Sequence, residues 1–193
     1  MEIDEQTPLG AAGPPLEAYS RVTNSERFAS LHDAAAELLD RLEQEFETER
    51  RVACGLDPEL EQGCNLSRPS VALLPRDIGA APLVVAFSDF PGLRVRFGRC
   101  YVVAFPTCGC DACDETAERE TEPLRSLIDN MTAGYFREAI RVRADGTEWK
   151  ESEFWSTGAR CAEELRLDQA HARELLDAGS RSSYQWVPWP RRK

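Results

Sequence analysis

Residues 83–105, LVVAFSDFPGLRVRFGRCYVVAF, decide the fold of this chain. β-Branched and aromatic residues dominate three short runs in this stretch, at 83–90, 93–97 and 100–105. Pro91-Gly92 and Gly98-Arg99 separate the runs, and dipeptides of this kind are typical of tight turns. Because links this short cannot join parallel strands, the three runs predict an antiparallel meander.

The middle run alternates strictly between apolar and basic residues. This period of two predicts that Leu93, Val95 and Phe97 face the core. Arg94 and Arg96 are then expected to face solvent. Four other runs have the composition of strands: Val71–Leu74, Ile140–Arg143, Glu148–Trp155 and Ala159–Leu165.

A long N-terminal helix is expected within residues 16–50, with Leu16, Tyr19 and Val22 in a short helix that precedes it, followed by a loop over residues 52–68. Apolar residues recur at spacings of three and four, which places them along one face of a helix. Asn24 or Ser25 can cap this helix. The apolar stripe consists of Phe28, Leu31, Ala35, Leu38, Leu39, Leu42 and Phe46.

A middle helix and a C-terminal helix are expected after the meander. Thr121 or Glu122 can cap the middle helix, which places Pro123 in the first turn, where a missing N–H is tolerated. If the helix instead starts earlier, at Asp114, Pro123 lies inside it and must kink it. Its apolar stripe consists of Leu124, Leu127, Ile128, Met131, Tyr135 and Ala139. The last helix is expected from Asp168 to Leu176.

Together these patterns predict an α+β fold, in which antiparallel β-meander strands pack with a long N-terminal helix, a middle helix and a C-terminal helix. A chain of 193 residues fits one domain, which we expect to span residues 16–190. Residues 1–15, rich in Pro and Gly, are expected to form a disordered leader, and residues 191–193 a basic tail. Trp186–Pro190 is expected to pack back onto the domain.

The acidic composition excludes several classes of function. A formal net charge of −11 argues against binding to nucleic acid or to an anionic membrane, since phosphate groups require a cationic face. The N-terminal residues are acidic and lack the apolar core of a signal peptide. No apolar run reaches the roughly 18 residues of a membrane span. We therefore expect a cytoplasmic protein whose seven cysteines are free thiols or metal ligands.

The densest chemistry lies in the block Cys108-Gly109-Cys110-Asp111-Ala112-Cys113-Asp114-Glu115. Cys110 and Cys113 have the C-x-x-C spacing that lets two sulfurs reach one zinc ion, and Cys108 can supply a third ligand. Asp111 or Asp114 can complete the set, or the fourth position can be open to water. More distant candidates for the fourth ligand are Cys54, Cys64, Cys100, Cys161, His32 and His171.

Two other interpretations of this block stay open. Cys110 and Cys113 could form a redox pair, but residues 111–122 carry six acids against one base. Such a field raises thiol pKa values, which opposes thiolate attack and favours a bound cation. The third interpretation is that small residues simply fill a crowded turn between a strand and a helix.

Several stretches resemble an uncharacterised bacterial domain family of unknown function that carries a CGCDACDE block. These stretches are Ala18–Asn24, Val85–Phe87, Phe90–Leu93, Ala104–Pro106 with Cys108–Glu115, and Trp186–Arg191. The resemblance spans about residues 16–192 and implies a single-domain bacterial protein without implying an activity. The family pattern has an aromatic residue at the position of Cys100 and does not feature the other three isolated cysteines. This favours a carboxylate of the block, a non-tetrahedral site or simple packing.

The sequence contains no G-x-S-x-G, P-loop, G-x-G-x-x-G or H-E-x-x-H motif. We therefore expect a non-enzymatic binding protein with a structural zinc site, whose acidic surface suits a basic protein partner. An antitoxin-like immunity protein is one form of this hypothesis. The competing hypothesis is an enzyme, either a zinc hydrolase with an open coordination position or a thiol oxidoreductase that uses Cys110 and Cys113.

Overall fold

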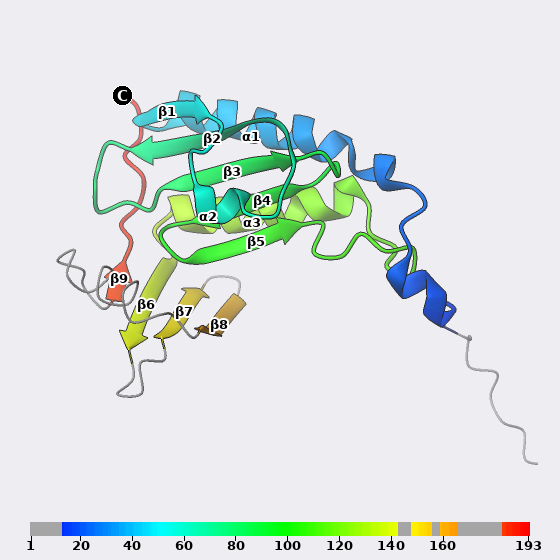
Figure 1. The fold of residues 1–193 in the computed structure, drawn as a ribbon. Helices are drawn as coiled ribbons and strands as arrows, with labels where there is room; N and C mark the ends of the chain where they lie inside the picture. Colours follow the sequence, from blue (N-terminus) through cyan, green and yellow to red (C-terminus); the bar gives the residue numbers. More distant parts are fainter. Residues whose placement is uncertain (1–12, 143–147, 156–158, 166–182) are drawn as a thin grey trace, which may run out of the picture.

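In the part of the chain that the structure describes, the main body is built on a five-stranded antiparallel sheet (Figure 1). This computed structural model describes residues 13–142, 148–155, 159–165 and 183–193. The strands follow one another in chain order across the sheet, which confirms the predicted meander over residues 83–105. Their bounds are β1 Thr48–Ala53, β2 Leu66–Pro75, β3 Leu83–Ser88, β4 Leu93–Phe97 and β5 Tyr101–Phe105.

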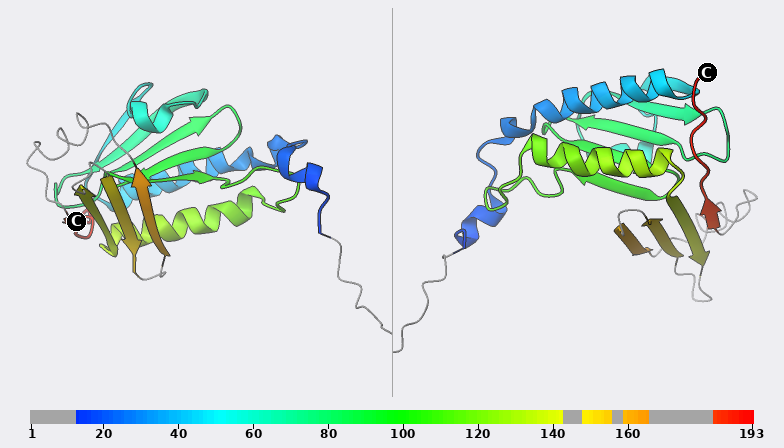
Figure 2. Two further views of the ribbon diagram at one scale, coloured as in Figure 1. Left: turned by 60° about the horizontal axis from the view of Figure 1, so that its bottom comes forward. Right: turned by 180° about the vertical axis from the view of Figure 1, so that it is seen from behind.

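Helices α1 (Ser30–Glu45) and α3 (Ala117–Thr132) lie side by side on one face of this sheet (Figures 1 and 2). Every residue of the apolar stripe predicted between Phe28 and Phe46 is at most 5% exposed, so that prediction is confirmed. Arg41 on α1 pairs with Asp129 on α3 at 3.0 Å. Because the apolar stripe of α1 is buried, packing of an amphipathic face contributes more to the position of this helix than helix propensity does.

A second antiparallel sheet, with strand order β8-β7-β6-β9, packs against the β4–β5 end of the first. The ring of Phe154 lies 5.7 Å from that of Phe97, 5.3 Å from that of Tyr101 and 4.3 Å from that of Phe136. This aromatic cluster joins the two sheets. The strands are β6 Phe136–Val142, β7 Glu148–Phe154, β8 Ala159–Leu165 and β9 Ser183–Gln185, of which β9 was not predicted.

Arg96 on β4 is buried, so the prediction that it faces solvent is wrong. It is 8% exposed, and its guanidinium donates to Asp57 at 3.0 Å and to Glu59 at 2.9 Å. These carboxylates lie at the start of α2 (Pro58–Glu61), a short helix in front of the sheet in Figure 1. The prediction of a loop over residues 52–68 is also wrong, because α2 and the start of β2 lie within that range.

The predicted N-terminal helix is too long at both ends. Two short 3-10 helices precede α1, η1 (Leu16–Ser20) and η2 (Ser25–Phe28). The first confirms the short helix expected around Leu16 and Tyr19, whereas Asn24 makes no side-chain cap. From Thr48 the chain enters β1 instead of continuing the helix. Pairing with β2 satisfies the backbone groups of these residues, which local helix propensity does not take into account.

Helix α3 begins earlier than predicted. Thr116 caps it by accepting a backbone N–H of the first turn, so the prediction that Thr121 or Glu122 caps the helix is wrong. Pro123 consequently lies inside the helix rather than in its first turn. Gly134, with a φ of +81°, follows the end of the helix. Two residues predicted on its apolar stripe therefore lie outside the helix, Tyr135 and Ala139.

The C-terminal segment packs back onto the domain, as predicted. Trp186 and Trp189 are 6% and 3% exposed, and the indole N–H of Trp189 donates to the Ala81 carbonyl at 2.9 Å. Arg192 hydrogen-bonds to the main chain at the end of α1. The helix predicted over residues 168–176 lies outside the described residues. Among the described helices, none has the length and apolar character that crossing a bilayer requires.

Candidate metal centre

Three cysteine sulfurs converge in the loop that joins β5 to α3. The Sγ atom of Cys110 lies 3.2 Å from that of Cys108 and 3.6 Å from that of Cys113. All three sulfurs lie within 4.8 Å of one another. Zn–S bonds of about 2.3 Å in a tetrahedron place two sulfurs about 3.8 Å apart. The loop therefore holds the sulfurs close to the spacing that one shared ion requires.

The sequence of the loop favours a tight turn. The backbone N–H of Cys113 donates to the carbonyl of Cys110 at 3.2 Å, which closes the turn across the C-x-x-C pair. Gly109 lies against the ring of Phe90, and a Cβ atom at Gly109 would lie 2.6 Å from the ring atom Cζ. A side chain is therefore excluded at position 109, where the chain turns between two cysteines.

Hydrogen bonds among the three cysteines shift the pKa values of Cys110 and Cys113 in opposite directions. The hydrogen bond from Cys108 lowers the pKa of Cys110, and the backbone N–H groups of Cys113 and Ala112 act in the same direction. The hydrogen bond with Cys110, followed by that with Cys108, raises the pKa of Cys113 to about 12. The rise at Cys113 comes from the neighbouring thiols and from burial, and not from the acidic residues to which the sequence analysis attributed a rise. Since thiolates are the form that binds metal, Cys110 is the sulfur best prepared for a cation.

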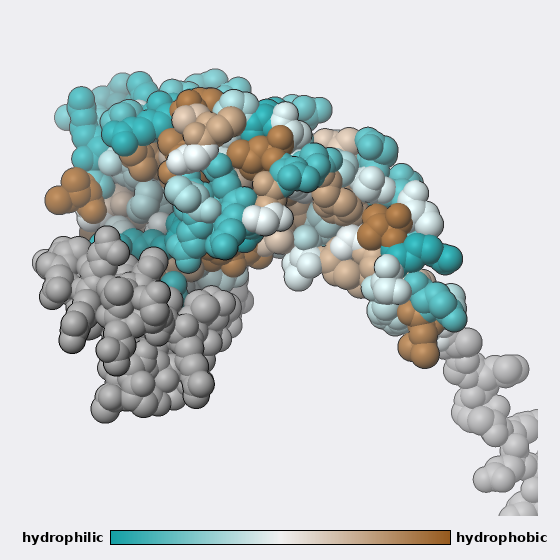
Figure 3. All heavy atoms as spheres, in the orientation of Figure 1, coloured by the Kyte–Doolittle hydropathy of each residue, from teal (hydrophilic) through white to brown (hydrophobic). Residues whose placement is uncertain are grey.

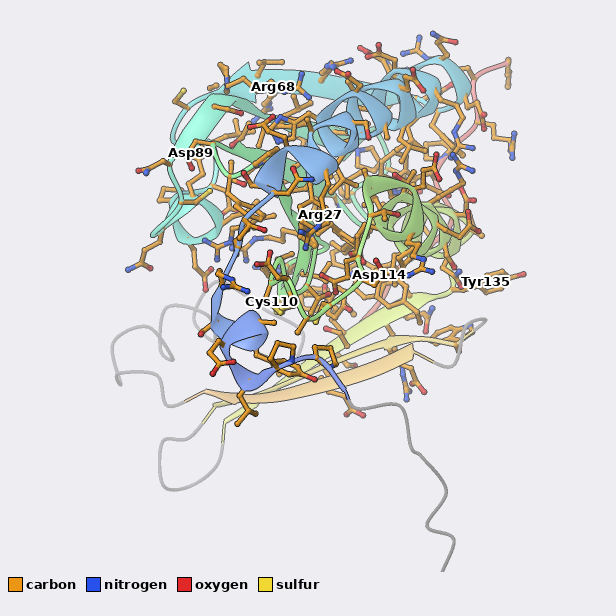
Figure 4. All side chains as sticks on the ribbon, turned by 90° about the vertical axis from the view of Figure 1, so that its right-hand side faces the viewer. Arg27, Arg68, Asp89, Cys110, Asp114 and Tyr135 are labelled. Carbon is orange, nitrogen blue, oxygen red and sulfur yellow. The ribbon has the colours of Figure 1, made fainter. Side chains whose placement is uncertain are left out.

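The N-terminal arm, residues 13–28, is bound to this loop through Asp111. Figure 4 shows Arg27 of the arm beside the segment of the loop that carries Cys110. One carboxylate oxygen accepts the backbone N–H of Thr23 at 2.8 Å and its hydroxyl at 3.1 Å. The other oxygen accepts from Nε of Arg21 at 3.2 Å. These contacts, the backbone N–H of Thr23 above all, lower the pKa of Asp111. Asp111 therefore holds the arm as a carboxylate.

Arg27 forms a second connection between the arm and the loop. Its guanidinium donates to the carbonyls of Gly109 at 3.1 Å and Cys110 at 2.9 Å. It also donates to the carbonyl of Glu115 at 3.2 Å. No sequence pattern points to Arg21, Thr23 or Arg27, because each lies more than 80 positions from its partners in the loop.

The two aspartates predicted as fourth ligands are not brought into the group of sulfurs. Asp111 is occupied by the arm, and Asp114 is exposed and pairs with Arg119 at 3.3 Å. The other described candidates also lie outside the group: Cys54, Cys64, Cys100 and His32. The side chains of the two remaining candidates, Cys161 and His171, lie outside the described part of the chain.

Asp111→Ala is expected to weaken the attachment of the arm to the loop while the body stays folded, because the contacts of Arg27 and the backbone hydrogen bonds from Asp111 and Ala112 remain. The change removes an acceptor of three hydrogen bonds, one of them from a guanidinium, and such charge-assisted bonds are the strong ones. Amide hydrogen exchange of residues 16–28 should accelerate about tenfold. The matched control is Asp114→Ala, which should leave exchange of the arm unchanged. Equal exchange in both variants would contradict the role assigned to Asp111.

Comparisons with known proteins identify a family but no function. A search of curated proteins and a search of solved structures both return no match. One family model covers residues 4–193, which is nearly the whole chain, and its description is a family of unknown function. The predicted resemblance to an uncharacterised domain family is therefore confirmed, and the protein belongs to the family of unknown function DUF6226.

Proposed function

We propose that this protein is a non-enzymatic interaction protein whose fold is completed by a zinc ion bound to Cys108, Cys110 and Cys113. The convergence of the three sulfurs within 4.8 Å carries this proposal. Thiolates are soft ligands that favour zinc over magnesium or calcium. The acidic residues of 111–122 add a field that favours a dication.

The position of the cysteine loop supports a structural role for the ion. The loop joins β5 to α3, and through Asp111 it also holds the N-terminal arm. An ion that fixes this loop therefore stabilises three parts of the fold at once. Cys110, at 5% exposure, offers little access to a substrate. Structural zinc of this kind contributes directly to the free energy of folding.

The N-terminal arm supplies an apolar surface for a partner. Leu16, Tyr19 and Val22 are 85%, 55% and 47% exposed. Figure 3 shows apolar side chains on the arm where it projects from the body. Three exposed apolar side chains within seven residues of a projecting segment support the assignment of the arm as the interaction site. Since the chain carries a formal net charge of −11, we assign a basic protein as the partner.

The zinc content of protein purified without added metal tests the ion. One zinc per chain is expected, with three thiols that react with a thiol reagent only after a chelator is added. The other cysteines serve as the internal control, because their reactivity should not respond to the chelator. A zinc content near zero, with the three thiols reacting at once, would remove the proposed site.

Replacing Leu16 and Tyr19 together by serine is expected to abolish capture of the partner without changing the thermal midpoint, since both side chains are exposed. Affinity capture from the native host at low salt, followed by mass spectrometry, measures this. The captured protein should be basic and should be released by salt, because exposed charges are screened. Ile78→Ser, at a position 96% exposed and outside the arm, is the matched control. Equal capture by both variants would move the interface away from the arm.

A further inference from the structure

We infer that the free edge of β5, together with the groove between β5 and α3, binds an extended segment of a basic protein as an added strand. β5 is the last strand in the order of the five-stranded sheet, and Figure 1 shows it as the outermost strand. This surface is separate from the N-terminal arm. The inference rests on the proposed function only in the assignment of a basic partner.

The backbone of β5 directs hydrogen-bonding groups away from its sheet. Backbone groups of Gly92 and Gly98, at the two ends of β4, hydrogen-bond on the β3 side. Because such groups alternate along a strand, the odd-numbered residues of β4 bond to β5, where the residues opposite them are also odd-numbered. The N–H and C=O groups of Val102 and Ala104 therefore point outward. Among the described residues, no backbone hydrogen bond joins these two residues to a segment outside the sheet.

β5 lacks the features that usually protect the edge of a sheet. Edge strands commonly carry charges, prolines or bulges that prevent pairing with another chain. The opposite edge of the same sheet, β1, contains Glu49, Arg50 and Arg51. β5 has the sequence YVVAF, without a charge, a proline or a shift of register. Tyr101 packs against the second sheet, which leaves Val102–Phe105 as the free length of the strand.

A groove of about 340 Å³ lies beside this edge, between β5 and α3. Side chains of an added strand alternate between the two faces of a sheet, so every second one would enter the groove. Its backbone would meanwhile pair with the outward groups of β5. In strand addition of this kind, main-chain hydrogen bonds give affinity and side-chain pockets give specificity. The apolar walls of the groove are Tyr101, Val103, Phe105, Pro123 and Leu127.

Charge indicates which partner fits the groove. Among the described residues that line it, Glu120 is the one that carries a charge. Burial raises the pKa of Glu120, and the negative charge of Glu115 raises it further. A lysine or arginine of the partner would therefore stabilise this carboxylate. A second copy of the chain would instead add its own net charge of −11, which opposes pairing between two copies.

A labelled peptide of about ten residues, in which valine alternates with lysine, tests the inference on the full chain at low salt. Fluorescence anisotropy measures its affinity, and the peptide should slow amide hydrogen exchange at Val102 and Ala104. Ala104→Pro removes an outward N–H without removing a bond of the sheet, so binding should weaken at least about tenfold. Ala104→Ser keeps this N–H and, as the matched control, should change the affinity less than about twofold.

A second pair of variants tests the charge of the groove. Glu120→Gln should weaken binding about threefold, whereas Glu118→Gln, at an exposed position outside the groove, should leave it unchanged. A peptide with glutamate in place of lysine should bind at least about tenfold more weakly. A peptide with N-methyl groups on every second residue should not bind, which keeps the test valid if Ala104→Pro does not fold.

The outcomes separate this inference from the proposed interface on the arm. No binding to the wild type, or equal binding by Ala104→Pro, overturns the assignment of β5. Equal affinity for the basic and the acidic peptide overturns the basic partner. A wild-type dimer in sedimentation analysis that Ala104→Pro converts to a monomer assigns the edge to a second copy instead. The chain with serine at Leu16 and Tyr19 should bind the peptide like the wild type, so failure of capture by the arm leaves this inference intact.

Discussion

Glu138→Ala is expected to lower the free energy of unfolding by about 4 kcal/mol, because the variant leaves one buried indole N–H and three partly buried backbone N–H groups without an acceptor. Glu138 lies on β6 and is 1% exposed. Its carboxylate accepts the indole N–H of Trp186 at 2.9 Å. It also accepts three backbone N–H groups at the β4–β5 turn, those of Arg99 at 2.9 Å, Cys100 at 2.7 Å and Tyr101 at 3.1 Å.

This carboxylate therefore connects the two sheets and the C-terminal segment. Burial raises the pKa of Glu138, while the hydrogen bonds from the backbone and from Trp186 oppose that shift. Urea unfolding followed by circular dichroism measures the loss of stability. Trp186→Phe removes one donor and keeps the carboxylate, so its effect should be smaller, about 1–2 kcal/mol. A loss below about 1 kcal/mol for Glu138→Ala would contradict the view that its partners become unsatisfied.

Cys110→Ser is expected to abolish zinc binding, with a loss of affinity of at least about 100-fold, because a direct ligand contributes more than an outer partner. Its sulfur lies between the other two and is the most buried of the three. Without the ion, the loop loses the contact that joins its two ends. The thermal midpoint should fall, and the N-terminal arm should exchange its amides faster.

Metal analysis and thermal unfolding with and without a chelator measure this prediction. The chelator should lower the midpoint of the wild type and leave that of Cys110→Ser unchanged, since the variant has no ion to lose. Cys64→Ser is the matched control, because the Cys64 thiol is shielded in part from solvent but lies outside the group of sulfurs. If Cys110→Ser retained a full complement of zinc, the three sulfurs would not be its ligands.

Local sequence patterns predicted correctly the helices and strands that have one face buried in the core and the opposite face toward solvent. On α1, apolar residues three and four positions apart form one stripe, and all of them are buried. On β4, Leu93, Val95 and Phe97 are at most 1% exposed, as their alternation predicts. These patterns work because residues a few positions apart must share a face once a helix or strand forms.

The wrong predictions share one physical cause: residues far away in the sequence pair with a charge or with backbone groups that the local pattern leaves unpaired. Arg96 alternates like a surface residue, but carboxylates from the α2 segment compensate its charge and allow it to be buried. Strand β1 contains Glu49, Arg50 and Arg51 and has no apolar alternation, yet pairing with β2 satisfies its backbone. Neither outcome can be predicted without knowing which segments become neighbours.

At the candidate site too, some features follow from the sequence alone and others depend on the tertiary structure. By itself, the sequence determined that three sulfurs lie in one tight turn after a strand. The three cysteines fall within six residues, and Gly109 allows the chain to turn between the first two. Only the tertiary structure decided the use of each neighbouring carboxylate. Asp111 binds an arm about 90 positions away, Asp114 faces solvent, and Glu115 keeps a buried oxygen unpaired. Short-range geometry is encoded by residue spacing, whereas the partner of a charge depends on the folding of the whole chain.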